Sequence, residues 1–120
     1  MRTGIVVFGH GSSVASANDA VRSVAAAAAR AGAWELYETA FLEAAPQLGD
    51  AVAKMVNEGA GEILVLPYFL TLGIHLQRDL PRLVEDLEQR HGVRIRVAPP
   101  LDGHMELSRI LVDRAAEASK

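Results

Sequence analysis

Four side chains that can bind a metal ion or move a proton follow strand-like stretches of the sequence: His10, Glu43, His75 and His104. His10 stands between two glycines in the segment FGHGSS, where a plain turn would need no imidazole. Neutral imidazoles bind borderline divalent cations such as Co²⁺, Fe²⁺ and Ni²⁺, and they accept protons near neutral pH. A carboxylate such as that of Glu43 can take up a proton or offset the charge of the cation. These residue types indicate a metal-binding or acid–base site, provided that the fold brings them together.

Four strand-like runs alternate with helix-like segments along the chain. The runs cover residues 5–8, 34–42, 62–68 and 93–98. This alternation predicts one flavodoxin-like α/β domain over residues 1–120, with three layers formed by helices on both faces of a parallel sheet. The first and third runs are almost wholly apolar, which favours central strands, whereas the other two carry charges that edge strands tolerate. The simplest right-handed arrangement is the strand order 2-1-3-4.

Apolar side chains recur at helical spacing in three of the remaining segments. Such stripes predict helix faces that pack in the core. They consist of Leu48, Val52, Met55 and Val56, of Leu80, Leu83, Val84 and Leu87, and of Leu107, Ile110 and Leu111. A compact domain of this length is expected to have a radius of gyration of about 13 to 14 Å.

The loops that follow parallel strands lie at one edge of the sheet, where ligands of such folds bind. This rule places His10, Glu43, His75 and His104 at a shared edge. Each residue also has a structural interpretation: His10 and His75 as hydrogen-bonding loop residues, Glu43 as a solvated acid, and His104 as part of the first turn of a helix. His91 precedes a glycine at the expected end of a helix, where the helix dipole favours a cation, and is predicted to be structural.

Three other motifs are incomplete in the region of His10. The segment GHGSSV begins like a dinucleotide-binding fingerprint, but Val14 stands where the third glycine is needed. The serine-hydrolase pattern G-x-S-x-G fails because Ala15 replaces its second glycine. A phosphohistidine site usually has an arginine just before the histidine–glycine pair, and this chain has Gly9 there. None of these three functions is therefore expected.

Composition narrows the range of partners. The 120-residue chain has no cysteine, so disulfides and thiolate metal sites are excluded and a metal must be held by His, Asp or Glu. With 12 basic and 15 acidic side chains, the formal charge is -3, so the chain lacks the excess of positive charge that is typical of nucleic-acid-binding proteins. No segment has the order of a signal peptide or the about 20 apolar residues of a membrane span. These features predict a cytoplasmic protein with neither nucleic acid nor a membrane as its partner.

Four sequence blocks together resemble one known family. They are GHGSS with Asn18 downstream, AFLEAAPQL at 40–48, LPYFLTLGIHLQRDLP at 66–81 and APPLDGH at 98–104. In order and spacing, over essentially the whole chain, they resemble the short sirohydrochlorin chelatases of the CbiX type. The resemblance implies a chelatase-type domain that is equivalent to one half of the longer, two-domain chelatases and works as a homodimer.

The same resemblance implies an activity and assigns residues to it. Members of the family insert a divalent metal into the tetrapyrrole sirohydrochlorin, in cobalamin or siroheme biosynthesis, without a permanently bound cofactor. Co²⁺ is the expected metal, with Fe²⁺ and Ni²⁺ as alternatives. The matching motifs assign the metal to His10 and His75, and they assign to Glu43 an acid that assists the metal or the proton exchange.

Further residues are expected to contact the tetrapyrrole. They are Gly11, Ser12, Ser13, Gly73, Arg78 and His104. Glycines let a broad, flat substrate approach the backbone, and Arg78 is a candidate to hold an acidic arm, whereas many relatives have an arginine where this chain has Ser13. Two other hypotheses stay open: a non-catalytic carrier of metal or tetrapyrrole that uses the same histidines, and a regulatory domain whose histidines are structural.

Overall fold

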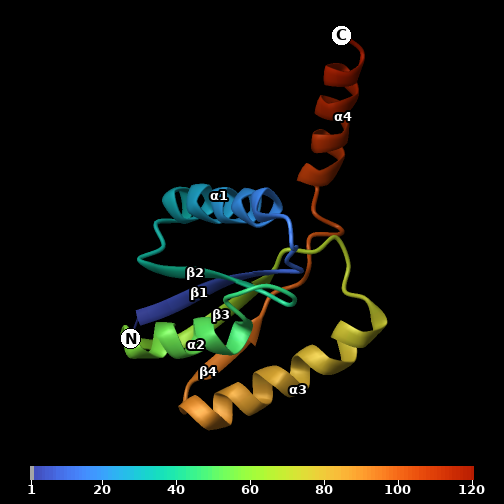
Figure 1. The fold of residues 1–120 in the computed structure, drawn as a ribbon. Coiled ribbons are helices and arrows are strands. Elements are labelled where there is room, and N and C mark those ends of the chain that lie inside the picture. Colours follow the sequence, from blue (N-terminus) through green and yellow to red (C-terminus); the bar gives the residue numbers. More distant parts are fainter. Residues whose placement is uncertain (1) are drawn as a thin grey trace.

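The computed structural model describes residues 2–120, in which four strands and four helices alternate (Figure 1). The strands are β1 (Arg2–Gly9), β2 (Leu36–Phe41), β3 (Ala60–Pro67) and β4 (Arg94–Val97). The helices are α1 (Ala15–Gly32), α2 (Leu48–Asn57), α3 (Ile74–His91) and α4 (Glu106–Ala118). The predicted α/β class is confirmed. None of the helices within residues 2–120 has the length and apolar composition needed to cross a membrane.

The four strands form one parallel sheet in the order β2-β1-β3-β4, as predicted. β1 lies between β2 and β3, so that Gly9 pairs with Phe41 and Phe8 pairs with Pro67. Six consecutive residues of β1 are buried, which explains why its sequence is apolar on both faces. The edge strand β4 instead has exposed Arg94 and Arg96. The carboxyl ends of the neighbouring strands β2, β1 and β3 therefore lie side by side at one edge of the sheet.

α1 lies on one face of the sheet, and α2 and α3 lie on the other (Figure 1). The main core fills the space between the sheet and the α2–α3 layer, where Val52, Met55, Ile63 and Leu87 are fully buried. The core stripes predicted for α2 and α3 are confirmed, apart from Leu83, which is 38% exposed. This rigid layer fixes the strands from which the loops of the site emerge.

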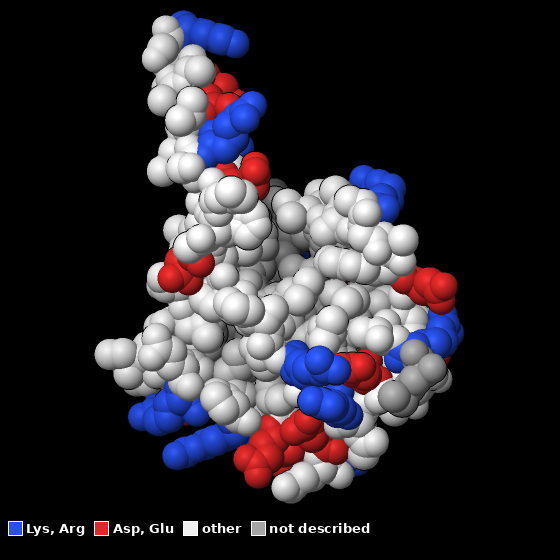
Figure 2. Space-filling view, turned by 180° about the vertical axis from the view of Figure 1, so that it is seen from behind, with Lys and Arg blue, Asp and Glu red and all other residues white. Residues whose placement is uncertain are grey.

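α4 extends away from the domain, and the core stripe predicted for it is wrong. Over residues 106–118, all of which the structure describes, no side chain is buried, and Leu111 is 71% exposed. Figure 2 shows charged side chains on one side of this projecting helix and uncharged ones on the other. Because α4 lengthens the molecule to 52 Å, the radius of gyration is 15.3 Å, above the expected value.

Candidate metal-binding site

His10 lies directly after β1 in a loop that packs tightly against the end of β2. Gly11 has a φ of 86°, a conformation that side chains other than glycine rarely adopt. A Cβ atom at this position would lie 2.9 Å from Cβ of Phe41 and 3.1 Å from Cβ of Ala44. The fold alone therefore requires a glycine after His10.

Main-chain hydrogen bonds continue the pairing of β1 and β2 beyond both strands and bring Glu43 beside His10. The amide of Leu42 donates to the carbonyl of Gly9 at 3.0 Å, and the amide of Glu43 donates to the carbonyl of His10 at 2.8 Å. The side chains then approach each other, with 3.9 Å between His10 Nε2 and Glu43 Oε2. Because these side chains are 60% and 66% exposed, and because an ion pair would require a protonated imidazole, this contact contributes at most about 1 kcal/mol.

The orientation of the His10 ring leaves one nitrogen available to a metal. Nδ1 lies 2.9 Å from the carbonyl oxygen of Gly11. Since a carbonyl oxygen can only accept, Nδ1 carries the proton in this arrangement and Nε2 keeps its lone pair. Histidine ligands of metals are commonly held in this way, by a backbone carbonyl that binds the second ring nitrogen. Nε2, the nitrogen nearest Glu43, is thus the candidate ligand.

His75 enters the same site from the first turn of α3. It lines one pocket of about 340 Å³ together with His10, Leu42, Phe69, Gly73, Ile74, Leu76 and Asp79. The structure therefore brings the two predicted metal-binding histidines to one pocket, with Glu43 adjoining through its contact with His10. Among residues 2–120, no three His, Asp or Glu side chains form a group that could hold a metal ion.

His75 is held by side chains of its own helix. An Nη atom of Arg78 lies 3.3 Å from His75 Nδ1, and Arg78 Nε donates to Asp79 Oδ1 at 3.0 Å. Because a guanidinium can only donate, Nδ1 of His75 accepts, and the proton of the neutral ring is on Nε2. The hydrogen bond from Arg78 also lowers the pKa of Asp79, with smaller contributions from the charges of Arg78 and Arg82.

Of the other residues predicted to contact the substrate, some lie at the pocket of His10 and His75 and others lie outside its lining. Gly73 lines it, and Arg78 adjoins it through His75 and Asp79. Ser12 and Ser13 belong to the His10 loop, in which Ser12 is tied to Asn18 and Ser13 is exposed. Roles for these residues in substrate binding stay predictions.

His104 is placed differently from the sequence-based expectation. It precedes α4 instead of lying in the first turn of that helix, and it does not line the pocket of His10 and His75. Its Nδ1 accepts a hydrogen bond from the amide of Glu106 at 3.1 Å, and its carbonyl accepts one from Leu107 at 3.2 Å. His104 therefore caps the start of α4, although a contact with substrate stays a prediction.

Sequence reasoning missed the apolar wall of the pocket. Ile74, between Gly73 and His75, is 81% exposed, and Leu42 is 39% exposed. Two such side chains beside a pair of histidines provide a surface for a flat apolar ligand. Leu42 and Ile74 are the sequence neighbours of Glu43 and His75, which could have indicated that they lie at the site. The sequence does not show, however, whether an apolar residue in the first turn of a helix, such as Ile74, is buried or exposed.

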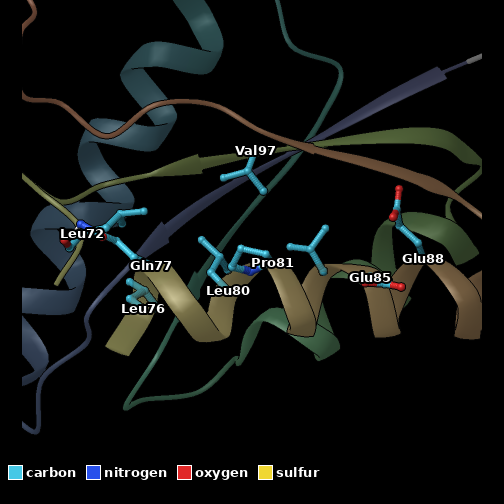
Figure 3. Close-up of a pocket in the computed structure, with 9 residues that line it drawn as sticks. Leu72, Leu76, Gln77, Leu80, Pro81, Glu85, Glu88 and Val97 are labelled. Carbon is cyan, nitrogen blue, oxygen red and sulfur yellow. Dashed lines mark hydrogen bonds between the residues drawn. The ribbon is translucent and has the colours of Figure 1, made fainter. Parts of the chain in front are cut away.

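A larger groove of about 600 Å³ lies between α3 and β4 (Figure 3). Apolar side chains dominate its lining, among them Leu72, Leu80 and Val97. The carboxylate of Glu88, at one end of the groove, accepts a hydrogen bond from the amide of Ile95 at 2.9 Å. Since the groove has no histidine in its lining, the smaller pocket is the better candidate for metal chemistry.

Comparisons with known proteins identify the family. The family model for CbiX matches residues 4–118. A sirohydrochlorin cobaltochelatase of Methanopyrus kandleri is 33% identical over 81 residues, which are 67% of this chain and 57% of that protein. The chain thus spans less than two thirds of the length of this relative.

Two solved structures share the fold. The crystal structure of a cobalamin (vitamin B12) biosynthesis CbiX protein from Marinobacter aquaeolei VT8 superposes with a TM-score of 0.84 at 32% identity, covering 97% of this chain and 96% of that one. The sirohydrochlorin chelatase SirB from Bacillus subtilis subspecies spizizenii, in complex with cobalt, gives a TM-score of 0.81 at 26% identity, covering 98% of this chain and 51% of that one. Since a family model matches nearly its whole length and a related structure superposes end to end, the chain belongs to the CbiX family.

Proposed function

We propose that this protein is a sirohydrochlorin chelatase, an enzyme that inserts a divalent metal, above all Co²⁺, into the tetrapyrrole. The observation that carries the proposal is the pair of histidines, His10 from the loop after β1 and His75 from the first turn of α3, which line one pocket at the carboxyl edge of the sheet. The names of the relatives support the substrate and the metal, because one is a sirohydrochlorin cobaltochelatase and another holds cobalt. The product of this reaction would enter cobalamin or siroheme biosynthesis.

The chemistry of the reaction matches the groups in the pocket. One divalent cation replaces two pyrrole protons, so the cation must lose water and two protons must leave the ring. His10 Nε2 has a free lone pair and can replace a water ligand. His75 supplies a second imidazole once the cation displaces Arg78 from its Nδ1. Glu43, 3.9 Å from His10 Nε2, is the carboxylate that accepts a proton close to the metal.

The surroundings of the histidines suit a broad substrate with an apolar ring and acidic arms. Leu42, Phe69 and Ile74 offer an apolar surface to the face of the ring. Arg78 adjoins the pocket, and an acidic arm of the substrate would compete with Asp79 for its guanidinium. Ser12, Ser13 and Gly73 are the small residues that allow the ring to approach the backbone.

The proposed enzyme is a homodimer, and α4 supports this assembly. α4 has 13 residues and no buried side chain, and isolated helices shorter than about 12 to 15 residues are marginally stable in water. The same chain has an uncovered apolar groove beside α1, lined by Val24, Ala28, Trp34, Leu66, Tyr68 and Leu101 among others. Figure 2 shows a broad uncharged area between the base of α4 and the body of the domain. A second copy can cover these surfaces with its own α4 and close the substrate site.

Light scattering on Leu111→Lys tests the homodimer. Leu111 lies in the apolar stripe of α4, so a charge there is expected to shift the protein from dimer to monomer. Ser108→Lys, on the same helix but already polar, is the matched control and is expected to stay dimeric. A wild-type monomer with full chelatase activity would contradict the homodimer.

The visible absorption spectrum of sirohydrochlorin with Co²⁺ or Fe²⁺ and substoichiometric protein tests the activity. The expected result is metal insertion over many turnovers, slowed by at least about 100-fold in His10→Ala and in His75→Ala. His91→Ala is the matched control, because His91 lies at the far end of α3. Binding of one equivalent of metal or tetrapyrrole without turnover would contradict the chelatase hypothesis and support the carrier hypothesis.

A further inference from the structure

We propose that Asn18 is a positioning residue for His10, because it fixes the peptide whose carbonyl holds the imidazole in the orientation that frees Nε2. The effect of Asn18 is on the position of the proton on the His10 ring. Its importance for function rests on the proposed metal-binding role of His10. Asn18 does not line the pocket, and its two hydrogen bonds go to Ser12 and not to the imidazole. It acts through the backbone of the loop.

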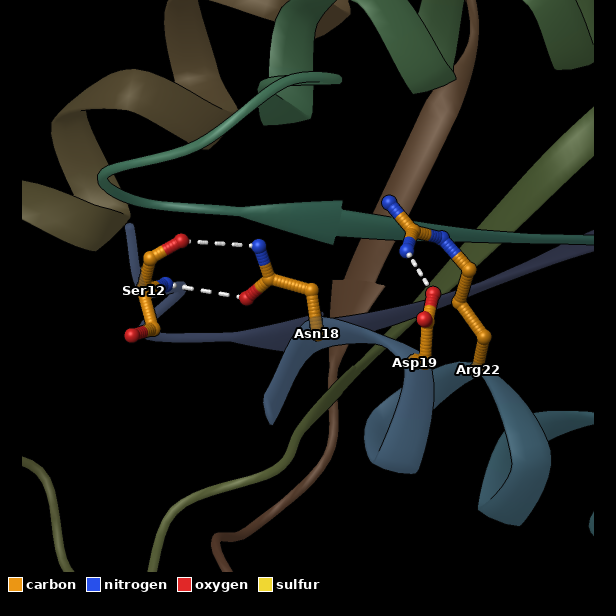
Figure 4. A network of polar contacts seen from close by, with 4 residues as sticks. All are labelled: Ser12, Asn18, Asp19 and Arg22. Atoms are coloured by element: carbon orange, nitrogen blue, oxygen red, sulfur yellow. Dashed lines mark hydrogen bonds and ion pairs between the residues drawn. The ribbon is translucent and has the colours of Figure 1, made fainter. Parts of the chain in front are cut away.

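The side chain of Asn18 forms two hydrogen bonds with the backbone of Ser12. Asn18 Oδ1 accepts from the amide of Ser12 at 2.9 Å, and Asn18 Nδ2 donates to the carbonyl of Ser12 at 2.8 Å. Figure 4 shows the Asn18 amide facing the Ser12 backbone from the first turns of α1. Both bonds are partly buried, so water competes with them less than with the exposed contacts of the loop.

The amide of Ser12 and the carbonyl of Gly11 belong to the same planar peptide unit. Since the unit is rigid, fixing the direction of the Ser12 N–H also fixes the direction of the Gly11 C=O. That carbonyl accepts the hydrogen bond from His10 Nδ1 at 2.9 Å. A continuous connection therefore runs from Asn18 through one peptide to the imidazole.

The clamp is needed because Gly11 allows more than one orientation of this peptide. Glycine has access to a wide range of backbone angles, so close packing around Gly11 does not by itself fix the peptide that follows. If the peptide rotates, the carbonyl no longer accepts from Nδ1 of His10, and the ring proton is free to reside on either nitrogen. Protonation at Nε2 would block the nitrogen that lies nearest Glu43.

Three variants separate this role from a general effect on the loop. Asn18→Leu has a similar size and removes both hydrogen bonds, whereas Asn18→Asp keeps the acceptor for the Ser12 amide but loses the donor. The matched control is Asp19→Asn on the same helix, since Asp19 pairs with Arg22 at 2.9 Å and not with the loop (Figure 4). Circular dichroism checks that each variant is folded.

The decisive readout is the position of the ring proton, which nitrogen-15 NMR of the His10 imidazole reports in the metal-free full chain. Wild type and Asp19→Asn are expected to hold the proton on Nδ1. Asn18→Leu is expected to show a mixture of both tautomers, and Asn18→Asp a smaller change. Calorimetric titration with Co²⁺ alone is expected to give about tenfold weaker binding in Asn18→Leu, as is typical when the partner of a ligating histidine is lost.

A folded Asn18→Leu variant in which His10 keeps its proton on Nδ1 would overturn the proposal. If Asn18→Leu fails to fold, Asn18→Ala, which also removes both hydrogen bonds to Ser12, decides the question by the same spectrum. Chelatase activity is not needed for either result. A shifted tautomer in a protein without chelatase activity supports the positioning role of Asn18 while contradicting the proposed function.

Discussion

The two histidines of the pocket are held in different ways. His10 stands in a loop with main-chain bonds to β2, a glycine that closely contacts Phe41, and the side-chain clamp of Asn18. His75 stands at the first turn of α3, where the one hydrogen bond of its ring within the described residues is the 3.3 Å contact with Arg78. A Cβ atom added at Gly73, just before this helix, would meet nothing within 4 Å. The site thus combines a fixed side and an accessible side.

This difference fits the proposed function, in which the site takes up a metal and transfers it to the tetrapyrrole. On the fixed side, the orientation of His10 defines where a cation would bind, at little cost in ordering when the cation arrives. On the accessible side, His75 and the 81% exposed Ile74 leave room for a broad substrate. Backbone variants of the His10 loop are therefore expected to change mainly stability, whereas variants around His75 are expected to change mainly substrate binding.

The largest effect is expected from Gly11→Ala compared with Gly73→Ala. At Gly11 the new side chain meets a positive φ and Cβ contacts of 2.9 and 3.1 Å, so the free energy of unfolding should fall by about 3 kcal/mol. At Gly73, where space is open, the change should stay below about 1 kcal/mol. Urea unfolding followed by circular dichroism measures both values. Equal losses in the two variants would show that the two loops are equally constrained.

Glu43→Gln is expected to have the next largest effect, on catalysis. The amide keeps the shape of the side chain and the main-chain bond to His10, but it cannot accept a proton as the carboxylate does. The rate of Co²⁺ insertion should fall by about 10- to 100-fold, near the low end for acid–base catalysis because Glu43 is 66% exposed.

The control for Glu43 is Glu35→Gln, at the opposite end of the sheet, where Glu35 contacts Arg2 at 3.5 Å. This variant should keep the wild-type rate of insertion. If Glu43→Gln also keeps it, then Glu43 does not take the proton, and another base or water does so.

Arg78→Ala tests the accessible side and should have a smaller effect. Loss of the guanidinium removes the partner of His75 and a candidate for an acidic arm of the substrate, so KM for sirohydrochlorin should rise about threefold, since exposed charge pairs contribute at most about 1 kcal/mol. Arg90→Ala, near the other end of α3, is the matched control. An unchanged KM in Arg78→Ala would remove Arg78 from the substrate site.

The sequence predicts the fixed side better than the projecting helix. β1 is recognisable because burial on both faces demands an unbroken apolar run, and parallel topology then places His10 and His75 at one edge. The stripe of α4 gives the same signal as a core helix, yet it is exposed in this chain. Helical periodicity reports that a face is apolar and not what covers it.

Two features of the site lie beyond such patterns. Asn18 has no special position in a helical stripe, and its importance follows from a loop conformation that brings Ser12 to its side chain. The capping contact of His104 with Glu106 depends on where α4 begins, and helix boundaries are poorly marked in this stretch. Both are contacts between a side chain and the backbone, which depend on local geometry more than on residue type.

The smallest effect is expected on the free energy of unfolding at acidic pH, through the Arg78–Asp79 contact of α3. The hydrogen bond from Arg78 lowers the pKa of Asp79 below its ordinary value of 3.8. A lowered pKa means that this contact stabilises the folded state above the ordinary value and that the stabilisation is lost as the pH falls through the lowered pKa. Urea unfolding of wild type and Arg78→Ala from about pH 5 to about pH 2 should therefore show a small difference in stability that disappears in acid. A difference that stays constant over this range would mean that Arg78 stabilises α3 by packing, so that the accessible side is held by more than one exposed charge pair.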